Sequence, residues 1–196
     1  MGILARKTSI ASAFTTSLTK NLSVPTAASA ILEAYNIAPD TSDDDAVQNI
    51  LAFANDIAYY LPALFYAKSW PGKSYYYHFN EPNPWEGAFK GCSTHLLDAV
   101  FLFQAYNEKL SDEAREVAVA LAKAFIKFAN GEAPWKEFEN KEGGLMRFGP
   151  GGEKVEEFVK GYGGEGRRDV LLRLKEEGVV DLDEVSAAWD LFFAGQ

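Results

Sequence analysis

One histidine in this sequence stands where it could act on a bound substrate. His95 is preceded by Cys92 and Ser93 and is followed three positions later by Asp98. Histidine serves as a general base because its ordinary pKa lies near neutrality, so it can accept and return a proton at physiological pH. The sequence therefore makes His95 a candidate catalytic base. The alternative is a residue that only begins a helix.

The elements expected around His95 are a strand, a loop and an apolar segment. Residues 74–79 form an aromatic run that is typical of a strand. Residues 80–94 are rich in Pro and Gly, which indicates a loop, and the apolar segment 95–103 begins at the histidine. Sites in open α/β sheets lie beyond the carboxyl ends of the strands. We therefore expect His95 at the end of a loop on the carboxyl side of this strand, with its ring beside a cavity.

The order of motifs along residues 75–135 is more specific than any one of them. An aromatic strand leads through a Pro- and Trp-containing loop and a glycine to the histidine, and an acidic residue and a Phe-x-Phe run follow. This order resembles the C-terminal part of the type B carboxylesterases, the branch of the α/β-hydrolase fold that includes the cholinesterases and many fungal esterases and lipases. The motifs are Tyr77-His78-Phe79, Pro82-Asn83-Pro84-Trp85, Gly91, His95, Asp98, Phe101-Leu102-Phe103, residues 106–111 and residues 128–135.

The resemblance implies a fold and a function. The fold would be the C-terminal part of an α/β-hydrolase, predominantly helical with one or two strands, in a single partial domain over residues 1–196. His95 would be the general base of a serine esterase or lipase acting on an ester substrate, with no cofactor and no metal. The partner of this chain would be the N-terminal portion of the same fold. One position departs from the pattern, because the family often has Gly directly after the histidine, where Leu96 stands.

The sequence lacks the serine that such an enzyme needs. α/β-Hydrolases carry their nucleophile in a G-x-S-x-G turn between a strand and a helix, and the triad follows in the order Ser, acid, His. Ser74 and Ser93 come nearest, but neither has Gly at the second following position. Gly2-Ile3-Leu4 resembles the segment that follows the family's triad acid, so the acid is also expected upstream. Of the triad, only His95 is present.

Three interpretations follow. In the first, the chain is the C-terminal portion of a serine esterase and is inactive and poorly soluble by itself. In the second, it is a shortened, non-catalytic relative that serves as a binding or interaction module. In the third, Cys92 and His95 form an unrelated cysteine enzyme, although a lone cysteine is more often an inert small hydrophobic residue.

Composition excludes several classes of function. The net charge of −9 and the absence of a Lys/Arg cluster argue against nucleic acid as a partner and against an anionic membrane surface. A single cysteine, Cys92, excludes an internal disulfide. No run of 18 apolar residues and no signal peptide are present, so no membrane span is expected, and the location would be cytoplasmic if Met1 is the true start. His78 is expected to be a packed residue instead of a ligand.

Helical periodicity predicts most other elements, and the strongest pattern covers residues 43–65. Ser42 can cap this helix, and three aspartates favour the positive end of its dipole. Pro62 predicts a kink or break near residues 59–61 because proline removes a helical hydrogen bond. Asp56 lies beside the apolar stripe and is expected to be structural. Further helices are expected at residues 1–22, 26–35, 111–129 and 167–176 and after Asp181, where Glu184 has capping-box spacing, and residues 145–148 are expected to form a short edge strand.

A glycine run imitates a nucleotide-binding motif. Residues 161–166 fit the pattern G-x-G-x-x-G and precede a predicted helix, where backbone N–H groups could hold a pyrophosphate. Too few residues follow for the second strand of a βαβ unit. The run is therefore interpreted as a loop with helix-capping glycines.

Overall fold

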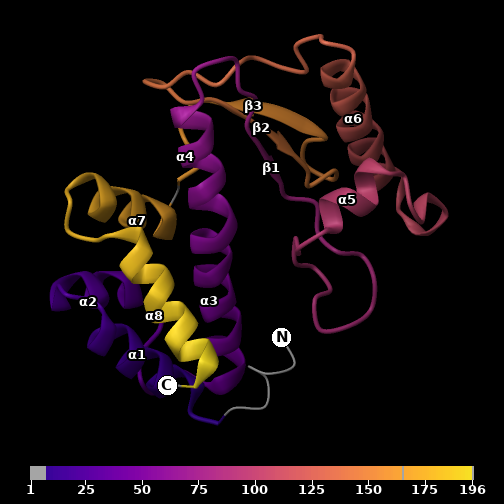
Figure 1. Ribbon diagram of the computed structural model, residues 1–196. Helices are drawn as coiled ribbons and strands as arrows, with labels where there is room; N and C mark the ends of the chain where they lie inside the picture. The colour runs from indigo at the N-terminus through magenta and orange to yellow at the C-terminus, as the bar shows by residue number, and fades with distance from the viewer. Residues whose placement is uncertain (1–7, 165, 196) are drawn as a thin grey trace. The chain divides into compact units, whose positions relative to one another are not determined.

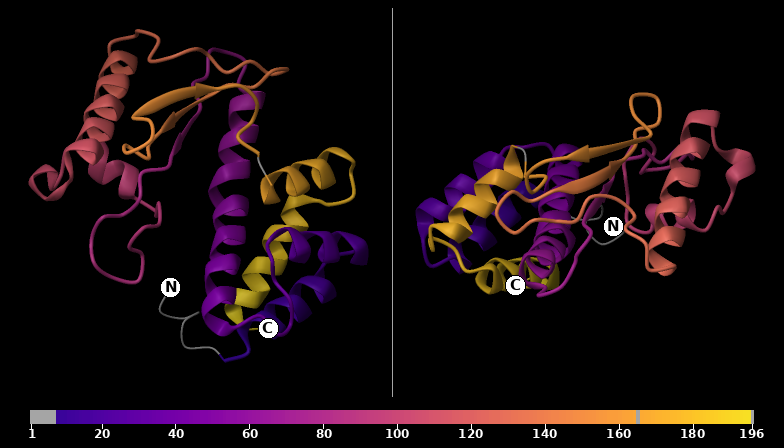
Figure 2. Two further views of the ribbon diagram at one scale, coloured as in Figure 1. Left: turned by 180° about the vertical axis from the view of Figure 1, so that it is seen from behind. Right: turned by 90° about the horizontal axis from the view of Figure 1, so that it is seen from above.

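The structure is a computed structural model that describes residues 8–164 and 166–195. These residues form helices and one small sheet, and 53% of them are helical (Figure 1, with further views in Figure 2). This confirms a mixed, predominantly helical α/β chain. The elements are α1 (Ile10–Asn21), α2 (Pro25–Ala34), α3 (Asp43–Asn55), η2 (Asp56–Tyr60), α4 (Leu61–Ser69), β1 (Tyr77–Phe79), α5 (Leu97–Leu102), η3 (Asn107–Lys109), α6 (Asp112–Ala129), β2 (Leu145–Phe148), β3 (Glu156–Val159), α7 (Arg167–Glu176) and α8 (Leu182–Ala194).

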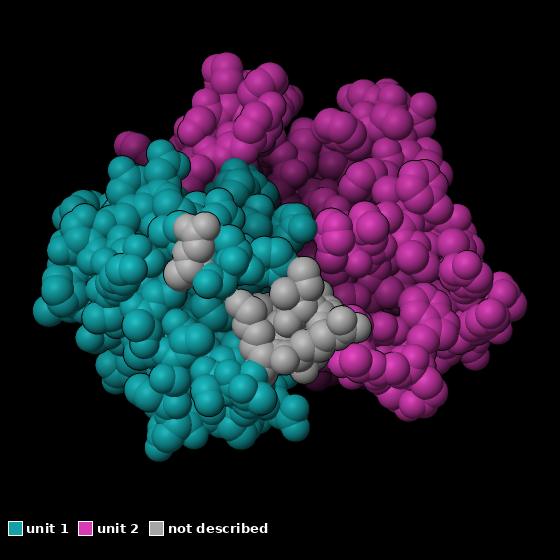
Figure 3. All heavy atoms as spheres, turned by 60° about the horizontal axis from the view of Figure 1, so that its bottom comes forward, with its two compact units in different colours: residues 1–63, 164–196 teal, residues 64–163 magenta. Residues whose placement is uncertain are grey.

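The chain forms two compact units, which Figure 3 distinguishes by colour. Unit 1 consists of residues 1–63 and 164–196, and unit 2 consists of residues 64–163. Unit 1 is helical, and unit 2 holds the sheet together with α5 and α6. The assignment of residues 1–196 to one partial carboxylesterase domain stays a prediction. The motif Gly2-Ile3-Leu4 lies outside the described residues.

The longest helical stretch runs from Asp43 to Ser69 and includes a π-helical segment, η2. The hydroxyl of Ser42 accepts a hydrogen bond from the backbone N–H of Asp45, so the predicted N-terminal cap is confirmed. At the other end of α3 the N–H of Leu61 donates to the carbonyl of Asp56, five residues back. This wider turn lies just before Pro62, which has no N–H to donate. The helix widens where a kink or break was predicted, and it continues to Ser69.

The extra residue in the π turn changes which side chains the helix buries. Ala58 is exposed, whereas Tyr60 is buried. By length and composition this 27-residue stretch could cross a membrane, and 44% of its most apolar window is buried inside the protein. Core helices pass the same test, so this is weak evidence for a span.

Aromatic rings from distant parts of the chain form the core of unit 1. Phe14 on α1 packs edge-to-face against Phe53 on α3 at 5.3 Å and against Phe192 on α8 at 5.0 Å. The capping box predicted for α8 is wrong. The side chain of Asp181 caps the helix by accepting from the N–H of Asp183, but Glu184 instead accepts hydrogen bonds from Ser23, at the end of α1.

The sheet of unit 2 has the order β1-β2-β3, with β1 and β2 parallel and β2 and β3 antiparallel. The sheet is therefore mixed, and the prediction that residues 145–148 form an edge strand is wrong, because this strand is central. The β3 strand was not predicted. On one face, Tyr77, Phe79 and Phe148 pack against α5 and α6. On the other, Tyr76 contacts Phe138 and the ring of His78, so His78 is packed as predicted.

The helix predicted at residues 111–129 covers that first face as α6. The hydroxyl of Ser111 accepts from the N–H of Ala114 and caps it. Val117, Ala118 and Leu121 on α6 are almost completely buried against Phe101 on α5. The apolar stripe of α6 is therefore buried within unit 2.

The described residues of the glycine run, 161–164 and 166, lie outside the named helices and strands. Gly161, Gly163 and Gly166 have positive φ angles, and Gly166 is the N-cap of α7. After α7 the chain forms α8, and no strand follows among the described residues up to 195. The interpretation of the run as a glycine-rich loop before a helix is confirmed.

Candidate functional site

The loop between β1 and α5 closes on itself and returns the chain to the end of β1. The N–H of Asn83 donates to the carbonyl of Cys92 at 3.1 Å, and the N–H of Gly91 donates to the carbonyl of Asn83 at 2.8 Å. The hydroxyl of Ser93 then donates to the carbonyl of Phe79, the last residue of β1, at 2.7 Å. These bonds hold the base of the loop against the carboxyl end of the strand.

His95 follows this anchor directly and is exposed to solvent. It therefore lies at the end of the loop on the carboxyl side of β1, as its sequence position predicts. Leu96, the next residue, has φ 66° and is 60% exposed. This left-handed conformation favours glycine and is uncommon for leucine. The backbone therefore adopts, just after the histidine, a conformation that glycine would adopt without strain.

Asp98, three residues after His95, is tied to the sheet. Its carboxylate accepts a hydrogen bond of 2.9 Å from the hydroxyl of Tyr77 on β1. Burial, the nearby charge of Asp98 and this hydrogen bond all raise the pKa of Tyr77 above its ordinary value, so the hydroxyl stays protonated. The bond fixes α5 to β1 and thereby holds the short segment that carries His95.

Glu81 is a second acidic residue at this edge of the sheet, and no motif in the sequence pointed to it. It is only 5% exposed, and its carboxylate accepts a hydrogen bond of 2.6 Å from the N–H of Gly151, in the turn after β2. Burial raises the pKa of Glu81, and the nearby charge of Glu113 raises it further, whereas the bond from Gly151 lowers it. A buried carboxylate thus joins the loops that leave the two parallel strands.

Unit 2 has two surface recesses that lie away from His95. Their lining residues come from residues 70–75 and 133–141 and do not include His95. The predicted cavity beside His95 therefore stays a prediction. Cys92 is exposed.

Asp56 is a charged residue of unit 1 with several partners, and the sequence suggested it only as a structural residue. Asp56 is completely buried at the start of the π turn. Its carboxylate accepts hydrogen bonds from Arg167 and Arg168 at 2.8 Å each, and from the hydroxyl of Tyr35 at 3.0 Å. Burial is the main cause of a raised pKa at Tyr35, and Asp56 adds to it. Two cations and one anion thus join the N-terminus of α7 to η2, which supports a structural role.

Two of the three aspartates at residues 43–45 accept hydrogen bonds near the start of a helix. Asp43 accepts hydrogen bonds from the backbone N–H groups of Ser9 and Ile10, at the start of α1. Asp45 accepts one from the hydroxyl of Ser42. No group of three or more His, Cys, Asp or Glu side chains able to hold a metal ion occurs among residues 8–164 and 166–195.

Comparison of the chain with protein-family models, curated proteins and solved structures finds no match to any of them.

Proposed function

We propose that this chain is the C-terminal portion of a serine carboxylic ester hydrolase of the α/β-hydrolase fold, with His95 as its general base. The observation that carries the proposal is the placement of His95. It is an exposed histidine at the end of a loop that is anchored to the carboxyl end of β1, a strand paired in parallel with β2. Sites of open α/β sheets occupy that edge.

The conformation of Leu96 supports the family resemblance independently. The family often has glycine directly after its histidine, and here that position has φ 66°. An L-residue in this region costs roughly 1–2 kcal/mol relative to its preferred conformations. The local backbone thus fits the family pattern at the one position where the side chain departs from it.

In the proposed reaction His95 accepts the proton of a serine hydroxyl as the oxygen attacks the ester carbonyl. It then returns that proton to the departing alcohol, and the cycle repeats with water. Residues of this chain hold the backbone on both sides of His95: Ser93 fixes the loop to β1, and Asp98 fixes α5 to Tyr77. The serine, the oxyanion donors and the triad acid would come from an upstream segment, since no serine here lies in a G-x-S-x-G turn.

The test compares this chain with a version extended upstream through a G-x-S-x-G segment, taken from a transcript of the same gene. We expect the 196-residue chain to hydrolyse no p-nitrophenyl ester and to react with no fluorophosphonate probe, because a base without a nucleophile cannot form an acyl-enzyme. The extended chain should do both. Replacing His95 in it with Gln or Ala should lower turnover by about 10²–10⁴-fold.

Two results would contradict the proposal. One is specific labelling of a serine within the 196 residues, and the other is an extended chain whose activity survives His95→Gln. Ser186→Ala, on α8 in unit 1, is the matched control and should leave turnover unchanged.

A second candidate is a self-sufficient, non-catalytic binding module. It is favoured by the burial of the apolar stripes of both long helices, including Ile50 and Phe53 on α3 and Val117 and Leu121 on α6. A cooperative thermal transition and a monomeric elution volume for the 196 residues, without an active extended form, would favour this candidate over the esterase portion.

A further inference from the structure

An exposed aromatic pair marks one end of α4. The rings of Tyr66 and Trp70 are stacked, with centroids 5.6 Å apart and planes 21° apart, because residues four positions apart lie on one helix face. Tyr66 is 66% exposed and Trp70 is 47% exposed. Aromatic side chains of this size are mostly buried in proteins. The pair therefore presents a flat apolar surface to solvent.

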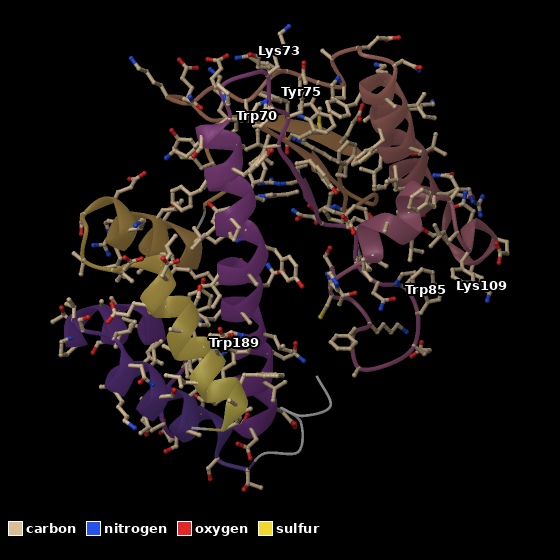
Figure 4. All side chains as sticks on the ribbon, viewed as in Figure 1. Trp70, Lys73, Tyr75, Trp85, Lys109 and Trp189 are labelled. Carbon is tan, nitrogen blue, oxygen red and sulfur yellow. The ribbon has the colours of Figure 1, made fainter. Side chains whose placement is uncertain are left out.

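The backbone of the next turn accommodates the indole. A Cβ atom on Gly72 would lie 3.0 Å from Nε1 of Trp70, so the glycine leaves room for the ring. Trp70, Lys73 and Tyr75 lie near one another in Figure 4, at the end of α4 and along the segment that leads to β1. The indole of Trp70 therefore lies at the start of the segment that joins α4 to β1.

A groove begins at Trp70 and runs between two segments of unit 2. The N–H of Phe138 donates to the carbonyl of Ser74 at 2.9 Å, which holds residues 70–75 beside residues 133–141. One recess of about 430 Å³ includes Trp70, and a neighbouring recess of about 520 Å³ includes Tyr75. The two share Glu137 and Glu139, so they adjoin. Each has the volume of a small-molecule site, roughly 300–1,000 Å³.

The polar side chains of the groove carry both signs of charge. Glu137, Glu139 and Asn140 offer hydrogen-bond acceptors, and Lys73, Lys136 and Lys141 offer donors. Lys136 already forms an ion pair with Glu139 at 2.7 Å. Three lysines and two carboxylates nearly cancel, so the lining carries little net charge, and the chain's net charge of −9 opposes the binding of phosphate groups. The lining suits an uncharged ligand that both donates and accepts hydrogen bonds.

We propose that this groove binds a neutral oligosaccharide, with one sugar ring stacked on Trp70 and the following rings lying along residues 133–141. A pyranose ring has an apolar C–H face, which matches an exposed indole, and a rim of hydroxyl groups, which match carboxylate, amide and ammonium side chains. Two adjoining recesses offer room for more than one sugar ring. This site lies apart from the His95 segment and does not depend on the proposed esterase.

The test is titration of the full chain with a panel of neutral hexasaccharides of glucose, xylose or mannose, followed by intrinsic tryptophan fluorescence and by calorimetry. At least one member should bind and change the fluorescence. Trp70→Ala should weaken that binding by at least about tenfold, because the stacking surface is lost. Asn140→Ala and Glu137→Ala change exposed side chains that do not support the core, and each should also weaken binding.

The matched control is Trp189→Ala in unit 1. Trp189 and Phe193 form another surface aromatic pair with a spacing of four residues, at 5.7 Å and 32°, and neither lines the groove. Trp189→Ala should leave saccharide binding unchanged. Equal loss in Trp189→Ala and Trp70→Ala would overturn the proposal, as would the failure of every hexasaccharide to bind. Binding of a single-stranded oligonucleotide at low salt in place of any saccharide would overturn it in favour of a nucleic-acid site.

Discussion

The hydroxyl of Tyr77 on β1 and the carboxylate of Asp98 on α5 are 2.9 Å apart, and this bond joins the strand to the helix that follows His95. A hydrogen bond to a charged group contributes about 1.5–3 kcal/mol. Because this one is only partly buried, Tyr77→Phe should lower the free energy of unfolding by about 1.5 kcal/mol, measured by urea denaturation at pH 7. Tyr66→Phe, at a residue that is 66% exposed, is the control and should have a smaller effect.

The same tyrosine predicts how stability changes in alkali. The pKa of Tyr77 is raised above 10.0 in the folded protein, so its contribution is fully present below pH 10 and is lost as the pH rises toward the folded pKa. Burial raises the pKa values of Tyr35 and Tyr60 in the same direction. Above pH 10 the unfolding free energy should fall less steeply for Tyr77→Phe than for the parent, by up to about 1.4 kcal/mol per pH unit. Equal slopes would contradict the assigned shift.

Asp56 should be the charge to which stability is most sensitive. Removing it leaves Arg167 and Arg168 without their shared buried carboxylate. Losing one partner of a buried ion pair costs about 3–5 kcal/mol, and partial exposure of the arginines places Asp56→Ala near about 3 kcal/mol. The exposed pair Arg173 and Glu177, also on α7, is the control, and Glu177→Ala should change the unfolding free energy by less than about 1 kcal/mol. If Asp56→Ala and Glu177→Ala lowered the unfolding free energy by similar amounts, the burial of Asp56 would not explain its contribution to stability.

Glu81 gives a prediction for mildly acidic to neutral pH. Its pKa is raised from 4.5, so the folded protein holds this proton more tightly than the unfolded chain, and stability falls as the pH rises from 4.5 through the folded pKa. Glu81→Gln keeps an acceptor for the N–H of Gly151 but removes the titrating carboxyl group, and with it the fall in stability with rising pH. The variant should therefore be more stable than the parent at pH 7. Below pH 4.5 it should have no such advantage. Glu81→Ala also removes the acceptor and should lose about 1–3 kcal/mol.

Gly163 should tolerate no side chain. It has φ 67°, and a Cβ atom there would lie 2.9 Å from Nδ1 of His78 and 2.7 Å from Leu145. Backbone strain and overlap together should make Gly163→Ala cost about 2–5 kcal/mol. Gly178 has the same φ but open space around its Cβ position, so Gly178→Ala isolates the strain and should cost about 1–2 kcal/mol. If thermal unfolding shows the same loss of stability for Gly163→Ala and Gly178→Ala, then the close approach of His78 is not the reason for a glycine at position 163.

Local signals in the sequence were enough to predict the helices. Ser42 caps α3 as predicted, and Ser111 caps α6 in the same way, because a cap depends only on neighbouring backbone N–H groups. Partners far away in sequence were not predictable. Glu184 has capping-box spacing but bonds with Ser23, and Asp56 finds its arginines more than a hundred residues later.

The sheet was less predictable than the helices because pairing defines a strand. β3 begins with two glutamates, Glu156 and Glu157, and its sequence shows no apolar alternation over its length. It is a strand because it pairs with β2, and that pairing also makes β2 central instead of an edge strand. At the candidate site, the position of His95 followed from chain order, whereas the buried carboxylate of Glu81 depended on a turn 70 residues away.

Unit 1 is built from two segments that are far apart in the sequence, residues 1–63 and 164–196, and this sets the order in which the two units can fold during synthesis. Its core joins Phe14 on α1 to Phe192 on α8, and Ser17 donates to the carbonyl of Ala188. A ribosome makes the N-terminal segment first, so α1 must wait until α8 has left the exit tunnel before this core can close. Unit 2, at residues 64–163, is complete earlier, and its contacts can form while the first helices of unit 1 still lack their last partner. Nascent chains stalled at successive lengths should therefore become resistant to protease first in unit 2.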